Sequence, residues 1–182
     1  TDLQLAAAPA IAWINEEAPR VDRPAVVFDI DETALSNWEA IKANNFSQFF
    51  TGSCARLPQG PCGLREWALR VQATLIPPTM DVYHAAKERG AAIFFITGRR
   101  ETLRAATEQN LQAVGYTSYT QLIMKPAGTH YASAADFKAP HRAGIQQQGY
   151  TIIANIGDQP SDLSGGFSER SYLLPNPFYR VP

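Results

Sequence analysis

Four apolar runs, each closing on polar or charged residues, constrain the fold of this chain more than any other feature. They are AVVFDID at 25–31, AAIFFITGR at 91–99, QLIMK at 121–125 and TIIANIGD at 151–158. Runs that are apolar almost throughout are typical of strands buried on both faces of a parallel sheet. Segments with helical spacing lie between them. This alternation predicts an α/β fold, a Rossmann-like parallel sheet with helices on both faces.

The segments between the runs predict helices, and one stretch departs from the alternation. The expected helices lie at about 80–89, 101–114 and 135–148, each followed by a glycine, after an N-terminal helix that stops near Pro19. Residues 36–78 carry two further helical patterns, WEAIKANNFSQFF and LREWALRVQATL, on either side of a loop. We therefore expect a single domain over residues 1–182 with a small helical, cap-like insertion at about 36–78 over the strand ends.

The loop of the insertion holds the only two cysteines of the sequence, Cys54 and Cys62. Its glycines and prolines make it flexible enough to bring the two thiols together, so we predict a disulfide. Such a bond would stabilise the fold by about 2.5 kcal/mol and indicates an oxidising compartment. Two unpaired thiols, or a metal site made by the two cysteines, are the alternatives.

Charge and hydropathy exclude several kinds of partner. The formal net charge is −1 and the isoelectric point is near 6.3, so a basic face for nucleic acid or an anionic membrane is not expected. No apolar run reaches the roughly 18 residues of a membrane span. The opening TDLQLAAAPAIAWINEE lacks the basic start of a signal peptide, so we expect a cytosolic or already processed chain. A small-molecule ligand fits this composition better than a polyanion.

The residues that end the apolar runs define a candidate site. In open parallel sheets, ligands bind beyond the carboxyl ends of the strands. The residues there are Asp29 and Asp31 in the first run, Thr97, Gly98 and Arg99 in the second, and Asp158, with Asp162 shortly after, in the fourth. The sheet therefore brings four carboxylates together with a hydroxyl, a backbone amide and a guanidinium, all groups that hold phosphate oxygens.

This set of groups fits phosphoryl transfer. Four neighbouring carboxylates repel one another unless a cation lies among them, and an oxygen-rich site favours Mg²⁺. Phosphoryl transfer needs a nucleophile, neutralisation of the phosphoryl oxygens and a proton donor for the leaving group. An ionised carboxylate can attack phosphorus without a separate base and form an aspartyl phosphate. The site predicts a Mg²⁺-dependent phosphatase of small-molecule phosphomonoesters.

Five motifs follow one another along the chain from about Val26 to Tyr179: FDIDETALSN, FFITGR, the FK before a helix, NIGDQPSDL and LPNPFY. In this order they resemble the motifs of acid phosphatases of the haloacid dehalogenase superfamily. The chain is similar to the branch that contains plant acid phosphatases, vegetative storage proteins and bacterial class B and class C acid phosphatases. The resemblance implies a broad-specificity acid phosphatase that uses Mg²⁺.

The resemblance also implies roles for the residues at matching positions. Asp29 would be the nucleophile, and Asp31 would be the general acid and base. Thr97 and Gly98 would bind the transferred phosphoryl group. The expected metal ligands are the Asp29 side chain, the Asp31 backbone carbonyl, the Asp158 side chain and, directly or through water, Asp162.

The family also needs a lysine that balances the charge of the nucleophile and the phosphoryl group. We expect Lys138, in DFKAPHR, because it opens the helix before the fourth strand and lies 20 residues before Asp158, as the resemblance implies. Lys125, at the end of the QLIMK strand, is the alternative.

Other polar and aromatic residues have two interpretations each. Asp29 and Asp31 could form a capping turn, but the ordered motifs argue against this. Arg99 could bind phosphate or belong, with Arg100 and Glu101, to a solvated helix start. The insertion aromatics are Trp38, Phe46, Phe49, Phe50 and Trp67. We expect core positions for most of them, whereas Trp38, close to the first motif, could equally contact an aromatic or nucleoside leaving group.

The sequence leaves two other functions open. Some vegetative storage proteins have lost the nucleophile, so a non-catalytic storage or binding protein on the same fold is one alternative, against which Asp29 argues. A phosphotransferase, in which an alcohol replaces water, is the other. The resemblance and the predicted disulfide together favour a periplasmic, envelope-anchored or secreted location.

Overall fold

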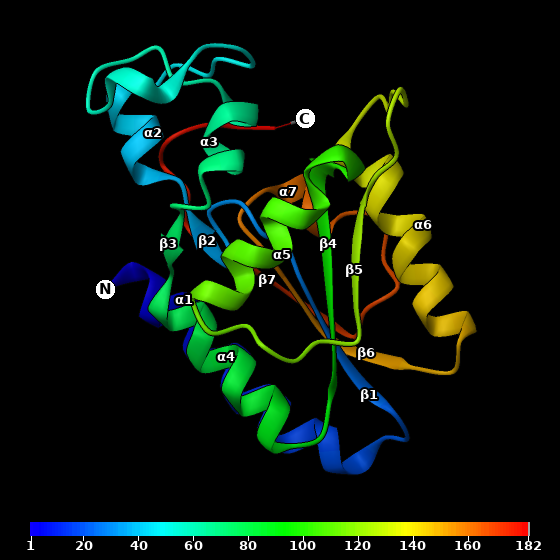
Figure 1. Cartoon of the computed structure of the whole chain (residues 1–182). Helices are drawn as coiled ribbons and strands as arrows, with labels where there is room; N and C mark the ends of the chain where they lie inside the picture. Colours follow the sequence, from blue (N-terminus) through cyan, green and yellow to red (C-terminus); the bar gives the residue numbers. More distant parts are fainter. Residues whose placement is uncertain (182) are drawn as a thin grey trace.

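A computed structural model describes residues 1–181, and the predicted parallel sheet is its centre. The sheet has the strand order β5-β4-β1-β6-β7, with every neighbouring pair parallel. Its strands are β1 (Pro24–Phe28), β4 (Ala92–Arg100), β5 (Gln121–Lys125), β6 (Thr151–Gly157) and β7 (Arg170–Leu173). Because all strands run the same way, their carboxyl ends meet at one edge of the sheet (Figure 1).

Helices cover both faces of the sheet (Figure 1). One face carries α1 (Asp2–Glu17), α4 (Pro77–Glu88) and α5 (Arg104–Ala113), and the other carries α6 (Ala134–Gln147). Val26 and Phe28 of β1 belong to the first core, and Ala25 and Val27 pack with Phe137 of α6 in the second. Burial on both faces explains why the strand sequences are apolar without alternation.

The helix boundaries differ slightly from the predicted ones, and several short helical turns accompany the main elements. The α4 helix begins three residues early, at Pro77, because a proline suits the first turn of a helix. A 3-10 turn at Glu101–Leu103 precedes α5, and others lie at Ala18–Arg20 and Cys54–Arg56. The short helix α7 (Pro160–Leu163) follows β6. Within residues 1–181, no helix is both long enough and apolar enough to cross a membrane.

The stretch at about 36–78 lies over the carboxyl edge of the sheet (Figure 1). A short antiparallel pair, β2 (Leu35–Ser36) and β3 (Thr74–Leu75), closes its base. Between them lie α2 (Trp38–Ala43) and α3 (Leu64–Arg70). Both helices are much shorter than their sequence patterns predict.

Residues with positive φ angles follow both helices. After α2, Asn45 and Phe46 have φ angles of 49° and 64°, which a right-handed helix does not allow. The buried Asn44 side chain instead bonds the backbone N–H and carbonyl of Cys62, both at 2.8 Å. After α3, Val71 has a φ angle of 56°, and the chain turns into β3.

The insertion bears out one prediction and corrects another. Cys54 and Cys62 form the predicted disulfide. Trp67 is buried as expected, but Phe46, Phe49 and Phe50 are exposed, Phe50 to 75%. The predicted core position is wrong for these three residues because the helix that would turn them inward ends at Ala43.

Candidate active site

Asp29 is the first residue beyond the central strand β1. Its backbone N–H donates to the carbonyl of Ile156 in β6 at 2.9 Å, and its side chain is buried. The buried Lys138, from α6, donates to the Asp29 carboxylate and to Oδ1 of Asp162, the latter at 2.6 Å. The alternative lysine, Lys125, lies over the ring of Tyr131, 5.5 Å from its centre. The structure thus brings Lys138, and not Lys125, against the predicted nucleophile.

Three buried carboxylates lie close together, and Lys138 contacts two of them, Asp29 and Asp162. Asp29, Asp158 and Asp162 each offer an oxygen, and these oxygens lie within 4.8 Å of one another. Burial raises the pKa of Asp29 well above its usual range; Lys138 opposes this rise, and the other carboxylates add to it. Burial and Asp162 raise the pKa of Asp158 in the same way. Three carboxylates around one lysine leave an excess of negative charge, which a divalent cation would balance.

Local contacts fix the orientation of Asp158 and Asp162. Oδ1 of Asp158 accepts a hydrogen bond from the Thr33 hydroxyl at 3.0 Å. Oδ2 of Asp162 accepts one from the backbone N–H of Gln159 at 2.9 Å and so caps α7. Gly157 makes the close approach possible, since a Cβ at this position would lie 2.5 Å from Cβ of Asp162. A glycine is therefore needed at the end of β6.

Arg142 holds the backbone that follows the carboxylates. It lies four residues after Lys138, on the same face of α6, and is fully buried. Its guanidinium donates to the carbonyls of Asp162 at 2.7 Å, Gly166 at 2.8 Å and Ser164. Sequence reasoning missed this residue, although its spacing from Lys138 was an available signal.

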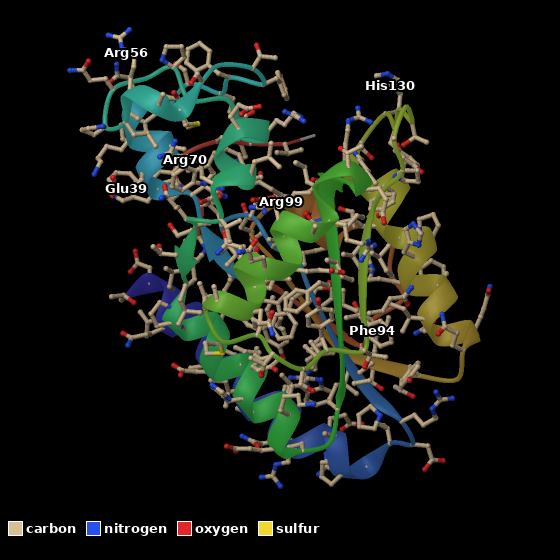
Figure 2. The ribbon with its side chains drawn as sticks, in the orientation of Figure 1. Glu39, Arg56, Arg70, Phe94, Arg99 and His130 are labelled. Atoms are coloured by element: carbon tan, nitrogen blue, oxygen red, sulfur yellow. A yellow bond between two sulfur atoms is a disulfide. The ribbon has the colours of Figure 1, made fainter. Side chains whose placement is uncertain are left out.

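The carboxylate of Asp31 is not part of this group of three and pairs with Arg99. Nη2 of Arg99 donates to Oδ1 at 2.7 Å, and Nε lies 3.1 Å from both carboxylate oxygens. Burial alone would raise the pKa of Asp31, but Arg99 and Asn37 outweigh it and lower that pKa. Figure 2 shows Arg99 at the strand ends below the insertion. The solvated position considered for Arg99 is wrong, because its side chain is only 7% exposed.

Thr97 and Gly98 lie at the end of β4, beside β1. The pairing of Phe28 with Phe95 brings this part of β4 alongside Asp29. The buried Thr97 hydroxyl accepts a hydrogen bond from the backbone N–H of Arg99 at 3.1 Å. Gly98 is exposed, and no atom lies within 4 Å of a Cβ built on it. The end of β4 therefore offers open backbone to a ligand.

A second network of hydrogen bonds surrounds the buried carboxylate of Glu32, next to Asp31 in the sequence. Glu32 is buried with a φ angle of 56°, and burial together with Asp31 raises the pKa of Glu32 to about 7. The Asn37 side chain bridges Oε2 of Glu32 and Oδ1 of Asp31, both at 2.9 Å. The Tyr179 hydroxyl donates to Oε2 of Glu32 at 2.7 Å. Sequence reasoning gave these residues no role, although FDIDETALSN and LPNPFY contain all of them.

Comparison with known proteins decides the family. A family model described as "HAD superfamily, subfamily IIIB (Acid phosphatase)" matches residues 2–182. The chain belongs to this family.

Three relatives illustrate the range of names within the family. The chain is 34% identical over 158 residues to the stem 28 kDa glycoprotein of Glycine max. It is 29% identical over 160 residues to acid phosphatase 1 of Solanum lycopersicum, and 32% over 157 residues to vegetative storage protein 1 of Arabidopsis thaliana. These alignments cover 85%, 87% and 86% of this chain but 59%, 60% and 55% of the relatives. The chain thus spans less than two thirds of their length.

Solved structures support the fold of this family member. It is similar to the class C acid phosphatase from Bacillus anthracis with tungstate bound, with a TM-score of 0.73 and 19% identity, over 99% of this chain and 80% of that chain. A chain of the Pnkp1/Rnl/Hen1 complex matches with a TM-score of 0.63 and 18% identity, over 86% and 47% of the two chains. At such identities the likeness concerns the fold.

Proposed function

We propose that this family member is a phosphomonoester hydrolase of the acid phosphatase type, with Asp29 as its nucleophile. One observation carries the proposal. The buried Asp29, at the end of the central strand, contacts Lys138 and lies with Asp158 and Asp162 in one carboxylate group. A structural ion pair needs only one carboxylate, and two further buried ones are unfavourable unless a ligand compensates them.

Mg²⁺ is the resident cation of this proposal. The side chains of Asp29, Asp158 and Asp162 and the backbone carbonyl of Asp31 would hold it. The donors are all oxygens, which hard divalent cations prefer. Burial raises the pKa of Asp29 and Asp158, and the neighbouring carboxylates add to this rise. When bound, the cation neutralises charge on the phosphoryl oxygens.

The chain's own residues supply the steps of the reaction. An oxygen of Asp29 bonds to phosphorus as the bond from phosphorus to the ester oxygen breaks, and Asp31 gives its proton to that departing oxygen. Asp31 then takes a proton from a water molecule whose oxygen attacks phosphorus, which releases phosphate and restores Asp29. Lys138, Thr97 and Gly98 would bind the phosphoryl oxygens.

Arg99 sets a condition on the first proton transfer. Its ion pair lowers the pKa of Asp31, so this carboxyl is ionised in the free protein. An approaching phosphate brings negative charge, which raises the pKa of a neighbouring carboxyl. The proposed mechanism therefore requires Asp31 to take up a proton when the substrate binds.

The stretch at about 36–78 acts as a cap in this proposal, within one domain. Trp38, 37% exposed, follows Asn37, which bonds Asp31. The centre of the Trp38 ring lies 6.0 Å from that of Phe46 and 5.3 Å from that of Phe178. Exposed aromatic rings beside the acid residue favour aromatic or nucleoside leaving groups. The substrate is a small phosphomonoester rather than a nucleic acid.

The disulfide bears on where the protein works. Disulfides persist in oxidising compartments, and Cys54–Cys62 joins the two ends of the insertion loop. We infer that the protein works outside the cytosol, in the periplasm, on the envelope or after secretion.

Hydrolysis of p-nitrophenyl phosphate between pH 4 and 8 tests the proposal, with Mg²⁺ or with EDTA. We expect Mg²⁺-dependent turnover in the wild type and a loss of roughly 10³-fold or more in Asp29→Asn, because no other group forms the bond to phosphorus. Asp22→Asn, an exposed aspartate in the loop before β1, is the matched control and should keep full activity.

The outcomes separate the competing functions. Full activity in folded Asp29→Asn would contradict the nucleophile. A wild type without turnover on aryl, alkyl and nucleoside phosphates would favour a storage or binding protein. Addition of glycerol identifies a phosphotransferase, because p-nitrophenol release would then exceed phosphate release.

A further inference from the structure

The C-terminal segment, residues 174–181, connects the sheet to the insertion. The N–H of Leu174 donates to the carbonyl of Gly157 at 2.8 Å, so the segment starts at the end of β6. From there it runs toward α2 and then turns past α3 to the C-terminal end, shown in red in Figure 1. Near its end, the ring of Phe178 packs against that of Trp38 at a tilt of 33°. The segment therefore crosses the carboxyl edge of the sheet, where the carboxylates lie.

Asn176 in this segment bonds a candidate metal ligand. Its side-chain Nδ2 donates to Oδ2 of Asp158 at 2.7 Å, and its Oδ1 accepts a hydrogen bond from the N–H of Phe178 at 2.9 Å. The second bond fixes which end of the amide faces Asp158. Gln159 Nε2 also donates to Oδ2 at 2.5 Å, and Thr33 holds the other oxygen. Asp158 is thus restrained from both sides.

Tyr179 acts on the first motif through two residues. Its hydroxyl donates to Oε2 of Glu32, and Asn37 links that same oxygen to Oδ1 of Asp31. The backbone N–H of Asn37 donates to Oε1 of Glu32 at 2.6 Å, and Trp67 Nε1 donates to Oδ1 of Asn37 at 2.8 Å. Every side chain between Tyr179 and Asp31 is therefore held in one orientation.

The end of the segment is tied to α7. The N–H of Val181 donates to Oε1 of Gln159 at 3.0 Å, and the Ser161 hydroxyl donates to the carbonyl of Val181 at 3.1 Å. Gln159 Nε2 also lies 3.4 Å from the carbonyl of Tyr179. Gln159 thus contacts both Asp158 and the backbone beside Tyr179, which makes the segment part of the wall of the site.

We propose that Asn176 and Tyr179 are positioning residues for the reaction. Asn176 orients the Asp158 carboxylate for the cation, and Tyr179 orients Asp31 for proton transfer through Glu32 and Asn37. The inference rests on the proposed phosphatase function and extends it to a segment about 150 residues from the first motif in sequence. Partners that orient a metal ligand typically affect metal affinity by 10- to 100-fold.

Three variants separate the two roles. Asn176→Leu has a similar shape but cannot hydrogen-bond, and Asn176→Ala removes the amide without adding an apolar chain. Tyr179→Phe removes only the hydroxyl. Tyr83→Phe is the matched control, because the Tyr83 hydroxyl donates to the carbonyl of Ser118 at 2.9 Å and touches none of the carboxylates. All four variants lose hydrogen bonds, so thermal unfolding shows the structural cost of each.

Calorimetric titration with Mg²⁺ alone and steady-state kinetics with p-nitrophenyl phosphate give the readouts. We expect both Asn176 variants to bind Mg²⁺ about 10-fold more weakly, while Tyr179→Phe binds it as the wild type does. At saturating Mg²⁺, Tyr179→Phe should lower kcat about 10-fold with KM unchanged. Tyr83→Phe should change the unfolding temperature alone.

Each half of the proposal has its own contrary result. Wild-type Mg²⁺ affinity in a folded Asn176 variant would overturn the role of Asn176. Wild-type kcat in Tyr179→Phe would overturn the role of Tyr179. A wild type without turnover would overturn the proposed function and the Tyr179 role with it, whereas the Mg²⁺ titration still decides the role of Asn176.

Discussion

Arg99 and Lys138 each bring a buried cation to the first motif, with different chemistry. The Lys138 ammonium is a point charge that contacts two carboxylates, and those carboxylates raise its pKa against the effect of burial. The Arg99 fork approaches both oxygens of Asp31 and also donates to the Thr107 hydroxyl at 3.3 Å. A planar fork fixes the orientation of a carboxylate, which a point charge does not. Lys138 therefore suits charge balance, and Arg99 suits orientation of Asp31.

A double-mutant cycle tests the Arg99–Asp31 pair. We expect Arg99→Met and Asp31→Asn to show a coupling of about 1–3 kcal/mol in the free energy of unfolding, because the pair is mostly desolvated and bidentate. Urea denaturation of the four proteins measures it. The control pair is Arg104 and Glu101, which lies at the surface and should couple by less than about 0.5 kcal/mol. Equal coupling in both cycles would contradict a special role for the Arg99 pair.

Helix α6 combines three functions in one element. Ser133 and Asp136 form a capping box that starts the helix. Phe137 and Ile145 face the sheet and belong to its second core. Lys138 and Arg142, one turn apart, reach the carboxylates and the backbone after α7. The packing that stabilises α6 thus also fixes the position of Lys138 relative to Asp29.

His141 of α6 should make the free energy of unfolding depend on pH. This imidazole packs against the ring of Phe137, with centroids 4.6 Å apart, and burial lowers its pKa. The unfolded chain, with a histidine pKa of about 6.5, then binds the proton more tightly than the folded chain. The stability that neutral His141 contributes is complete above about pH 6.5 and is lost as the pH falls below it.

Urea denaturation at pH 5.0 and pH 7.5 checks this expectation. The wild type should lose more stability between the two pH values than His141→Gln, which cannot take up a proton. Between pH 7.5 and pH 8.5 the two proteins should change in parallel. An equal loss in both proteins at pH 5.0 would mean that the folded chain binds the His141 proton as tightly as the unfolded chain does.

At the scale of the whole molecule, the sequence predicts those features that depend on patterns of neighbouring residues. The four main strands and the meeting of Asp29 with Asp158 follow from uniformly apolar runs and from the rule that parallel strands end at one edge. The early ends of α2 and α3 do not follow, because contacts such as Asn44 with Cys62 override helical propensity. Nor does the link from Tyr179 to Glu32, since 147 residues separate the two. Such pairs become neighbours only once the sheet has formed.

The carboxylate group joins β1, β6 and α7, so a cation bound there should stabilise the whole fold. A ligand at 100 times its Kd that binds only the folded state stabilises it by about 2.7 kcal/mol. For a chain of this size we expect Mg²⁺ at that concentration to raise the Tm by roughly 5–10 °C relative to EDTA. Differential scanning calorimetry measures the shift.

Matched aspartate variants make the origin of that shift specific. Asp158→Asn removes one member of the carboxylate group and should abolish most of the Mg²⁺-induced rise, whereas Asp81→Asn, exposed on α4, should keep it. A rise of equal size in both variants would assign the cation to another part of the surface. The absence of a rise in the wild type would contradict Mg²⁺ binding by the carboxylate group and with it the resident cation of the proposal.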